Sequence, residues 1–291
     1  MDLNSSVDFQ DLKKKWQTKH KEVKKDLFKK HGDAINKFYN TSKELAIGSL
    51  SGLLLLTAPS LPSLPPHADA IGSEKVASLS KNTFLINDLK NVLPDNVESL
   101  SSEEEEKVLE VLKRDIGVDV KAEINGIRLN RMYGYIGAEQ HLARYPGDNM
   151  YSHFQNSEDS LKYWSSGMAP GLGAWGYFTS SHSQMTEQDV LREKYYIAVQ
   201  TFLAPGFSQR TGEFIKFFKY RKMIVVNPQN GKAMAVVIGD AGPGKSTGKQ
   251  LGGSPEVMKY LERVDGAQKG PVLYFFIDDP EDKIPLGPIN Y

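Results

Sequence analysis

The segment from Tyr133 to Asp148 contains a glutamate, a histidine, an arginine, an aspartate and three tyrosines, which are residue types that can bind a ligand or react with it. Tyrosine faces suit stacking on sugar rings, and charged side chains suit paired hydrogen bonds to sugar hydroxyls. We therefore expect a glycan site in this segment, with Glu139 and Asp148 as candidate acid–base carboxylates. The candidate substrate-binding residues of the segment are His141, Arg144 and Tyr145.

His141 leaves two interpretations open. The Glu139–His141 pair suits acid–base chemistry or metal binding, but side chains two residues apart share a face only on a strand, and the sequence places no third ligand. In the alternative, the segment is a structured loop in which His141 is hydrogen-bonded to backbone. We predict neither a metal nor a cofactor.

A second segment, residues 167–178, is rich in glycine and contributes Trp175 and Tyr177 as further candidates for substrate binding. Such a segment suits the wall of a groove. Glycine-rich aromatic loops also serve as barrel corners without any ligand, and that interpretation stays open.

Gly239–Ser246 (GDAGPGKS) match the nucleotide-binding pattern G-x-x-x-x-G-K-[ST]. A P-loop needs a helix directly after its lysine, because loop amides and the helix N-terminus together hold phosphate. Here Thr247–Pro255 follow, and their three glycines and one proline cannot sustain a helix. The sequence therefore predicts no bound nucleotide, and a nucleoside triphosphatase is the minor alternative.

The elements that position these residues are mostly strands. Apolar runs predict strands over 193–202, 222–227, 232–240 and 271–279. One helix is expected among them, from Ser254 to about Arg263, with the serine as its N-cap and proline in its first turn. Many strands and few helices indicate a mainly β fold, either a barrel or a sandwich.

Two local signals precede this region. Ser101 followed by acidic residues predicts a helix that Gly117 ends. Asn125-Gly126 then predicts a hairpin turn.

The stretch Val225–Leu261 resembles the central signature of the rare-lipoprotein-A-like and expansin-like double-psi β-barrels. It carries, in the family's order, N-P-x-N-G-K, AMAVVIGD, Gly-Pro, Thr-Gly-Lys and S-P-E-V-M-x-x-L. The resemblance implies a six-stranded double-psi β-barrel with short helices over residues 118–291. It also implies an extracytoplasmic location and a cell-wall or envelope glycan, of the peptidoglycan type, as partner.

The same resemblance implies that Asp240 is a candidate general acid for glycosidic bond cleavage. The alternative is that Asp240 caps the following turn through backbone amides. Two positions depart from the family pattern: Phe217 lies where the relatives often carry a histidine, and Gly253 replaces an aspartate.

The N-terminal part of the sequence predicts export across a membrane or anchoring in one. Residues 1–43 hold 11 lysines against 6 acidic residues and form a basic amphipathic segment. Residues 44–70 combine an apolar core, a proline-rich exit and Ala68-Asp69-Ala70, in the order of a secretory signal. We expect a signal or an anchor that meets the membrane through residues 45–66, with a buried helix of a soluble protein as the alternative. Residues 71–117 are expected to form a helical spacer.

Bulk composition limits the functional classes. The 36 basic and 36 acidic residues balance, which argues against nucleic-acid binding by the whole chain. The absence of cysteine excludes disulfides, thiolate metal sites and cysteine nucleophiles. Two hypotheses remain: a glycan-binding envelope module whose groove also uses Trp164, or a lytic transglycosylase or glycan hydrolase that uses Asp240.

Overall fold

A computed structural model describes residues 70–263 and 269–291 of the chain. Ala68–Tyr291 form one compact unit. The predicted basic segment 1–43 and the predicted membrane segment 45–66 lie outside the described residues. Within the described ranges, no helix is both long and apolar enough to cross a membrane.

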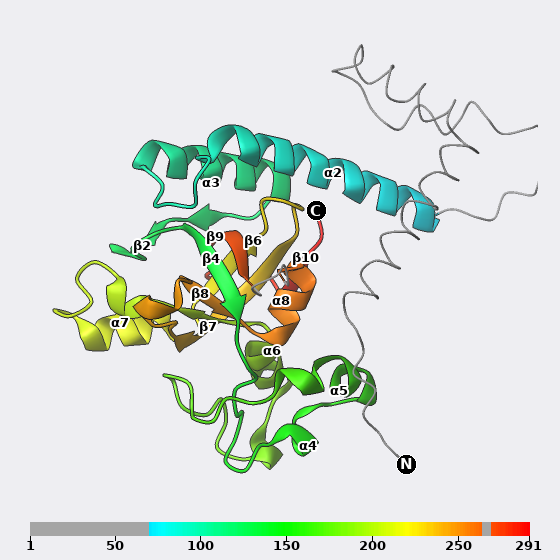
Figure 1. Cartoon of the computed structure of the whole chain (residues 1–291), viewed down its shortest axis with the longest axis vertical. Helices are drawn as coiled ribbons and strands as arrows, with labels where there is room; N and C mark the ends of the chain where they lie inside the picture. Colours follow the sequence, from blue (N-terminus) through cyan, green and yellow to red (C-terminus); the bar gives the residue numbers. More distant parts are fainter. Residues whose placement is uncertain (1–69, 264–268) are drawn as a thin grey trace, which may run out of the picture. The chain divides into compact units, whose positions relative to one another are not determined.

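A closed, mixed barrel of six strands with short helices forms the centre of this unit (Figure 1). Its strands are β4 (Tyr133–Ala138), β5 (Tyr196–Val199), β6 (Lys222–Val226), β7 (Ala233–Ala241), β8 (Leu251–Gly253) and β9 (Lys269–Ile277). Around the ring the order is β9-β4-β8-β5-β7-β6 and back to β9. The β4–β8 and β5–β7 pairs are parallel, and the other neighbours are antiparallel.

Short strands extend the barrel at two places. β1 (Val120–Lys121) pairs with β9, and β10 (Gly287–Ile289) pairs with β7. The expected hairpin is confirmed as β2 (Glu123–Ile124) and β3 (Ile127–Arg128), whose turn residues Asn125 and Gly126 have positive φ of 53° and 72°.

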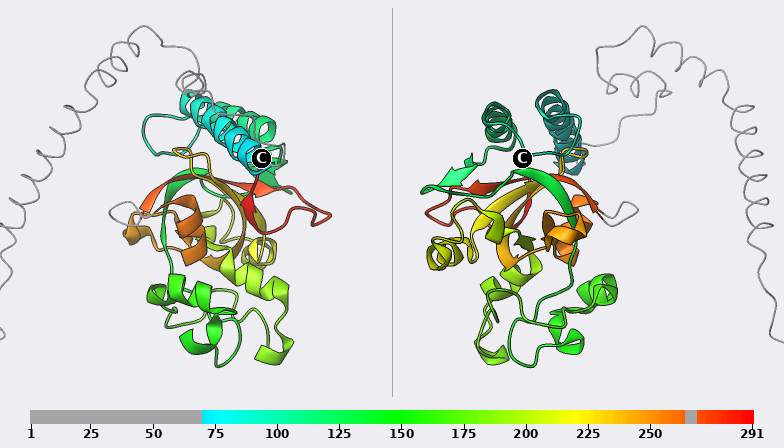
Figure 2. Two further views of the ribbon diagram at one scale, coloured as in Figure 1. Left: turned by 90° about the vertical axis from the view of Figure 1, so that its right-hand side faces the viewer. Right: turned by 60° about the vertical axis from the view of Figure 1, so that its left-hand side comes forward.

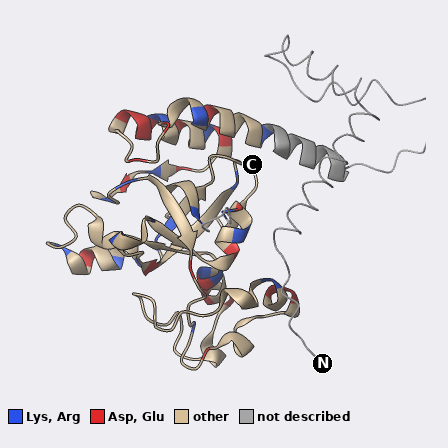
Figure 3. Cartoon of the chain, in the orientation of Figure 1, with Lys and Arg blue, Asp and Glu red and all other residues tan. Residues whose placement is uncertain are grey.

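Helices α2 (Ala70–Val92) and α3 (Ser102–Ile116) lie together against one side of the barrel (Figures 1 and 2). Ser101 and Glu104 form a reciprocal capping box, and Gly117 ends α3 in the left-handed conformation, as predicted. Acidic residues crowd the first turn of α3 (Figure 3), where they complement the helix dipole. Leu89 and Leu112 join the same hydrophobic core as the barrel strands, so the predicted spacer packs as part of the barrel unit.

The crossover from β4 to β5, residues 139–195, forms a helical lobe on the side of the barrel opposite to α2 and α3 (Figure 2). Its elements are α4 (Met150–His153), α5 (Ser157–Tyr163), η2 (Trp164–Ser166), η3 (His182–Gln184) and α6 (Glu187–Lys194). The remaining helices are η4 (Thr201–Leu203), α7 (Thr211–Phe218), η5 (Lys245–Thr247) and α8 (Pro255–Leu261).

Two expectations about this part of the chain were wrong. The sequence predicted one helix among the strands, but α7 also forms there, because Phe214, Phe217 and Phe218 pack into the core, and α6, which Thr186 caps, precedes β5. The structured-loop alternative for Tyr133–Asp148 was wrong for the first part of the segment, because Tyr133–Ala138 is strand β4, whose glycines obscured the strand pattern.

The turn that carries N-P-x-N-G-K is built by its asparagines. Oδ1 of Asn227 accepts a hydrogen bond from the Gln229 amide at 2.9 Å, and Oδ1 of Asn230 accepts one from the Lys232 amide at 3.0 Å. Gly231 takes a φ of 74°. The two asparagine side chains and Gly231 therefore form the turn that connects β6 to β7.

The segment after β7 does not form a P-loop helix. Only the three-residue η5 follows Gly244, and Gly248 then turns the chain at a φ of 67° into β8. The prediction that glycine and proline break this run is confirmed. Without the helix N-terminus, the lysine of the motif has no phosphate cradle beside it.

Candidate functional site

Asp240 lies in a row of small residues across four strands of the barrel. Ala198 is opposite Asp240 on β7 and opposite Gly252 on β8, and Gly252 is opposite Gly137 on β4. Directly opposed residues point to the same face of a sheet. Tyr196 of β5 lies on this same face, whereas Ile197 and Val199 of β5 belong to the main hydrophobic core.

The Asp240 carboxylate is held through one of its oxygens. Oδ1 accepts hydrogen bonds from the amides of Ala174, at 2.6 Å, and Ala241, at 2.7 Å. Oδ2 accepts no hydrogen bond from the described residues. The bond to Ala241 matches the capping alternative, and Oδ2 leaves one oxygen for a ligand.

Glu139 reaches the same face from the end of β4. A Cβ on Gly252 would lie 2.2 Å from Cγ of Glu139, so this side chain covers the glycine. Nζ of Lys249 donates to Oε1 of Glu139 at 2.6 Å and to the Ala138 carbonyl at 3.1 Å. Gly252 is therefore required because the Glu139 side chain occupies the space above it.

A pocket of about 380 Å³ lies beside Glu139, between the end of β4, η2 and α8. We call it the Glu139 pocket. Its lining combines a carboxylate, an amide, hydroxyl groups and ammonium groups with the apolar surface of Ala138, Pro255 and Met258. The lining residues are Ala138, Glu139, Gln140, Lys162, Tyr163, Ser165, Ser166, Pro255, Met258 and Lys259.

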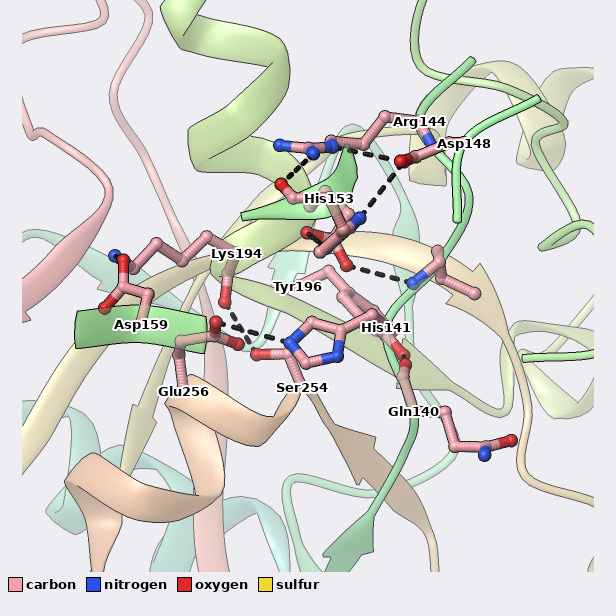
Figure 4. Close-up of polar contacts among 12 residues, drawn as sticks. Gln140, His141, Arg144, Asp148, His153, Asp159, Lys194, Tyr196, Ser254 and Glu256 are labelled. Atoms are coloured by element: carbon pink, nitrogen blue, oxygen red, sulfur yellow. Dashed lines mark hydrogen bonds and ion pairs between the residues drawn. The ribbon is translucent and has the colours of Figure 1, made fainter. Parts of the chain in front are cut away.

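Three of the other predicted site residues meet in the helical lobe. His141, Arg144 and Asp148 join His153, Glu193 and Glu256 in what we call the buried cluster. Figure 4 shows His153 facing Asp148, with the Arg144 guanidinium beside them. The Arg144 guanidinium also donates to the His153 carbonyl, which ties α4 to the preceding loop.

His153 bridges two carboxylates. Its Nδ1 lies 3.0 Å from Oδ2 of Asp148, and its Nε2 lies 3.1 Å from Oε2 of Glu193. Burial lowers the pKa of His153, but hydrogen bonds to both carboxylates and the charge of Glu193 outweigh burial and raise the pKa to about 9. Burial also raises the pKa of Asp148, but the hydrogen bonds from His153 and the Arg144 amide bring it below its ordinary value.

His141 is hydrogen-bonded to backbone, as the structured-loop alternative predicted. Its Nδ1 lies 3.0 Å from the carbonyl of Gly167, which can only accept, so Nδ1 carries the hydrogen. Its Nε2 lies 3.4 Å from Oε1 of Glu256. Glu193, in turn, accepts from the Leu142 amide at 2.9 Å. These contacts fasten the chain after β4 to α6 and α8.

A second pocket, of about 390 Å³, opens beside the buried cluster. His153, Glu193 and Glu256 line it, together with apolar residues of α6 such as Val190 and Leu191. Most charged groups of the cluster are already paired with each other, which leaves few of them for a ligand. Among the described residues, no three histidine, aspartate or glutamate side chains are arranged to hold a metal ion.

The predicted aromatic residues are placed differently from one another. Tyr145 is buried with its ring 5.0 Å from that of His182, and the Trp175 indole donates to the Ile238 carbonyl at 3.0 Å. Tyr177 is more accessible, with 38% of its surface exposed. None of these three lines either pocket.

Sequence reasoning missed His153, Glu193, Glu256 and Lys249. The signals were weak: Asn149 before α4 and Thr186 before α6 are helix caps, and each places a cluster residue on a short helix. Asp189 is a buried member of the α6 capping box. Function has to be inferred from this geometry, because no protein-family model, no curated protein and no solved structure matches the chain.

Proposed function

We propose that this chain is a cell-envelope protein, exported or anchored in a membrane, whose double-psi β-barrel binds glycan of the peptidoglycan type. The observation that carries the proposal is the Glu139 pocket. Its carboxylate, its Gln140 amide and the hydroxyls of Ser165 and Ser166 supply both donors and acceptors at close quarters. Sugars present the same two kinds of group, and Tyr163 adds an aromatic wall.

Two further observations support the remaining parts of the proposal. Two parallel strand pairs within a closed ring suit the double-psi assignment. Helix α2 begins at Ala70, so a cut after the Ala68-Asp69-Ala70 pattern would leave almost all of that helix intact.

Replacing Glu139 with glutamine tests the binding site. We expect binding of the full-length protein to purified peptidoglycan to weaken by about tenfold, because a hydrogen bond to a charged group contributes roughly 1.5–3 kcal/mol. The measurement is the bound fraction in a sedimentation series. Glu213→Gln, which changes an exposed glutamate paired with Arg210, is the matched control and should bind as the wild type does. Equal binding by both variants and the wild type would contradict the assignment of the site.

Glycosidic bond cleavage with Asp240 as general acid is a second candidate, favoured by one observation. Asp240 and Glu139 lie on the same face of the barrel with only Ala198 and Gly252 between them. Two strand spacings of about 4.8 Å separate Asp240 from Gly252, and inverting glycosidases hold their carboxyls roughly 6.5–9.5 Å apart. Asp148, also predicted as a second carboxylate, has a fully buried side chain engaged by Arg144 and His153.

Asp240→Asn separates the two candidates. If Asp240 donates a proton, the wild type should release soluble sugar fragments from peptidoglycan and Asp240→Asn should release at least about a hundredfold less. Chromatography of the soluble fraction measures the release. No release from the wild type, with binding retained, would leave the binding module as the function.

A further inference from the structure

Two aromatic side chains of the helical lobe are exposed and touch each other. Tyr151 of α4 has 90% of its surface exposed and Trp164 of η2 has 42%. Their ring centroids lie 5.1 Å apart at an angle of 73°, an edge-to-face contact. We call these two residues the aromatic pair. Large apolar rings exposed together on a surface indicate a binding region more often than single exposed residues do.

The backbone near the aromatic pair is fixed by a helix cap and by an ion pair between helices. Oδ1 of Asn149 accepts from the Tyr151 amide at 3.0 Å and so fixes the first turn of α4. Lys194 of α6 donates to Asp159 of α5 at 2.9 Å, which ties α5 to the rest of the lobe. Binding would therefore cost little ordering of the backbone beneath the two rings.

The aromatic pair adjoins the Glu139 pocket. Trp164 lies in the chain between Tyr163 and Ser165, and both of these neighbours line the pocket. The loops near α4 carry few charged residues (Figure 3), whereas α5 beside Trp164 carries Glu158, Asp159 and Lys162. A polymer that leaves the pocket along η2 would meet the indole next.

We propose that the aromatic pair is a stacking subsite for an additional sugar ring of a glycan chain whose preceding disaccharide unit occupies the Glu139 pocket. This inference rests on the proposed function and specifies its ligand as an oligosaccharide longer than one pocket can hold. The C–H groups on one face of a pyranose ring pack on an aromatic face, while the sugar hydroxyls stay in water. The edge-to-face contact holds the indole in place for that packing.

The competing explanation is a membrane contact. Leu161, three residues before Trp164, has 87% of its surface exposed. A lipid interface would bury this leucine together with the rings, since aromatic and aliphatic residues enter interfaces together. Stacking of a sugar ring on the aromatic pair does not involve Leu161, so a substitution of this leucine distinguishes glycan binding from a membrane contact.

The test compares two soluble β-1,4-linked N-acetylglucosamine oligomers, a dimer and a hexamer, by calorimetry with the full-length protein in detergent. For Trp164→Ala we expect hexamer affinity to fall about three- to tenfold and dimer affinity to stay unchanged, given typical aromatic contact energies. Trp164→Phe, which keeps a ring, should retain most of the hexamer affinity. Phe202→Ala removes another exposed aromatic that lines neither pocket and should change nothing.

The outcomes separate this inference from the proposed function. Unchanged hexamer affinity in Trp164→Ala, with both oligomers weakened by Glu139→Gln, would overturn the stacking subsite and leave glycan binding in place. If the wild type binds neither oligomer, the glycan function fails and the subsite fails with it. A shift of tryptophan emission on adding anionic vesicles that Leu161→Glu abolishes, with no effect of Trp164→Ala on the hexamer, would assign the surface to a membrane instead.

Discussion

Replacing His153 with alanine is expected to lower the free energy of unfolding by about 3–5 kcal/mol, because the change leaves two buried carboxylates without their shared partner. Asp148 and Glu193 both face this imidazole, and their side chains are almost fully buried. Chemical denaturation of the full-length protein at pH 6.5 measures the loss. His182→Ala, which removes a histidine from the polar connection before α6, serves as the control.

The stabilisation that His153 contributes is expected to decrease as the pH rises. The pKa of His153 is about 9 in the folded protein against an ordinary value of 6.5, so folding binds a proton more tightly. That difference corresponds to about 3 kcal/mol, present in full below pH 6.5 and lost as the pH rises through 9. The gap between wild type and His153→Ala should therefore narrow between pH 6.5 and 9.5. A gap that stays constant over this range would show that His153 acts only by filling space.

Replacing Gly239 with alanine is expected to destabilise the barrel by about 1–3 kcal/mol or more, because the new methyl group would overpack the β5–β7 pair. It would lie 2.6 Å from Cβ of Tyr196 and 3.0 Å from its Cγ. Tyr196 cannot move aside easily, because it is 1% exposed and its hydroxyl donates to the Gln140 carbonyl at 2.5 Å. The shift in the denaturation midpoint measures the effect.

Gly244→Ala is the matched control within the same G-x-x-x-x-G-K-S pattern. No atom lies within 4 Å of the added Cβ, and the φ of −64° is ordinary for alanine. We expect a change of less than about 0.5 kcal/mol. In a P-loop the second glycine would be the sensitive one, so the reverse order of effects would contradict the barrel interpretation of this segment.

The sequence predicted the strands that are buried on both faces and the ends of several helices. β6, β7 and β9 read as continuous apolar runs because one face lines the barrel and the other is covered. Ser101 and Ser254 are caps whose effect is local, so a few neighbouring residues suffice to predict them.

The candidate site was harder to predict because its parts are far apart in the chain. His141 and Asp148 lie close in sequence, but Glu193 and Glu256 reach them only after the crossover folds back onto the barrel. Lys249 pairs with Glu139 across 110 positions, which no local pattern encodes. Three-residue β8 is too short and too rich in glycine to be recognised, although it completes the ring.

The closed ring of six strands also limits how copies of this protein can associate through backbone pairing. Closure leaves the main sheet only two edges among the described residues, β1 with two residues and β10 with three, and β10 contains Pro288, which has no amide hydrogen to donate. Long exposed edges are the usual templates for intermolecular backbone pairing and aggregation. Among the described residues, the main sheet therefore offers no long edge, and self-association at high concentration should not propagate through it as an extended intermolecular sheet.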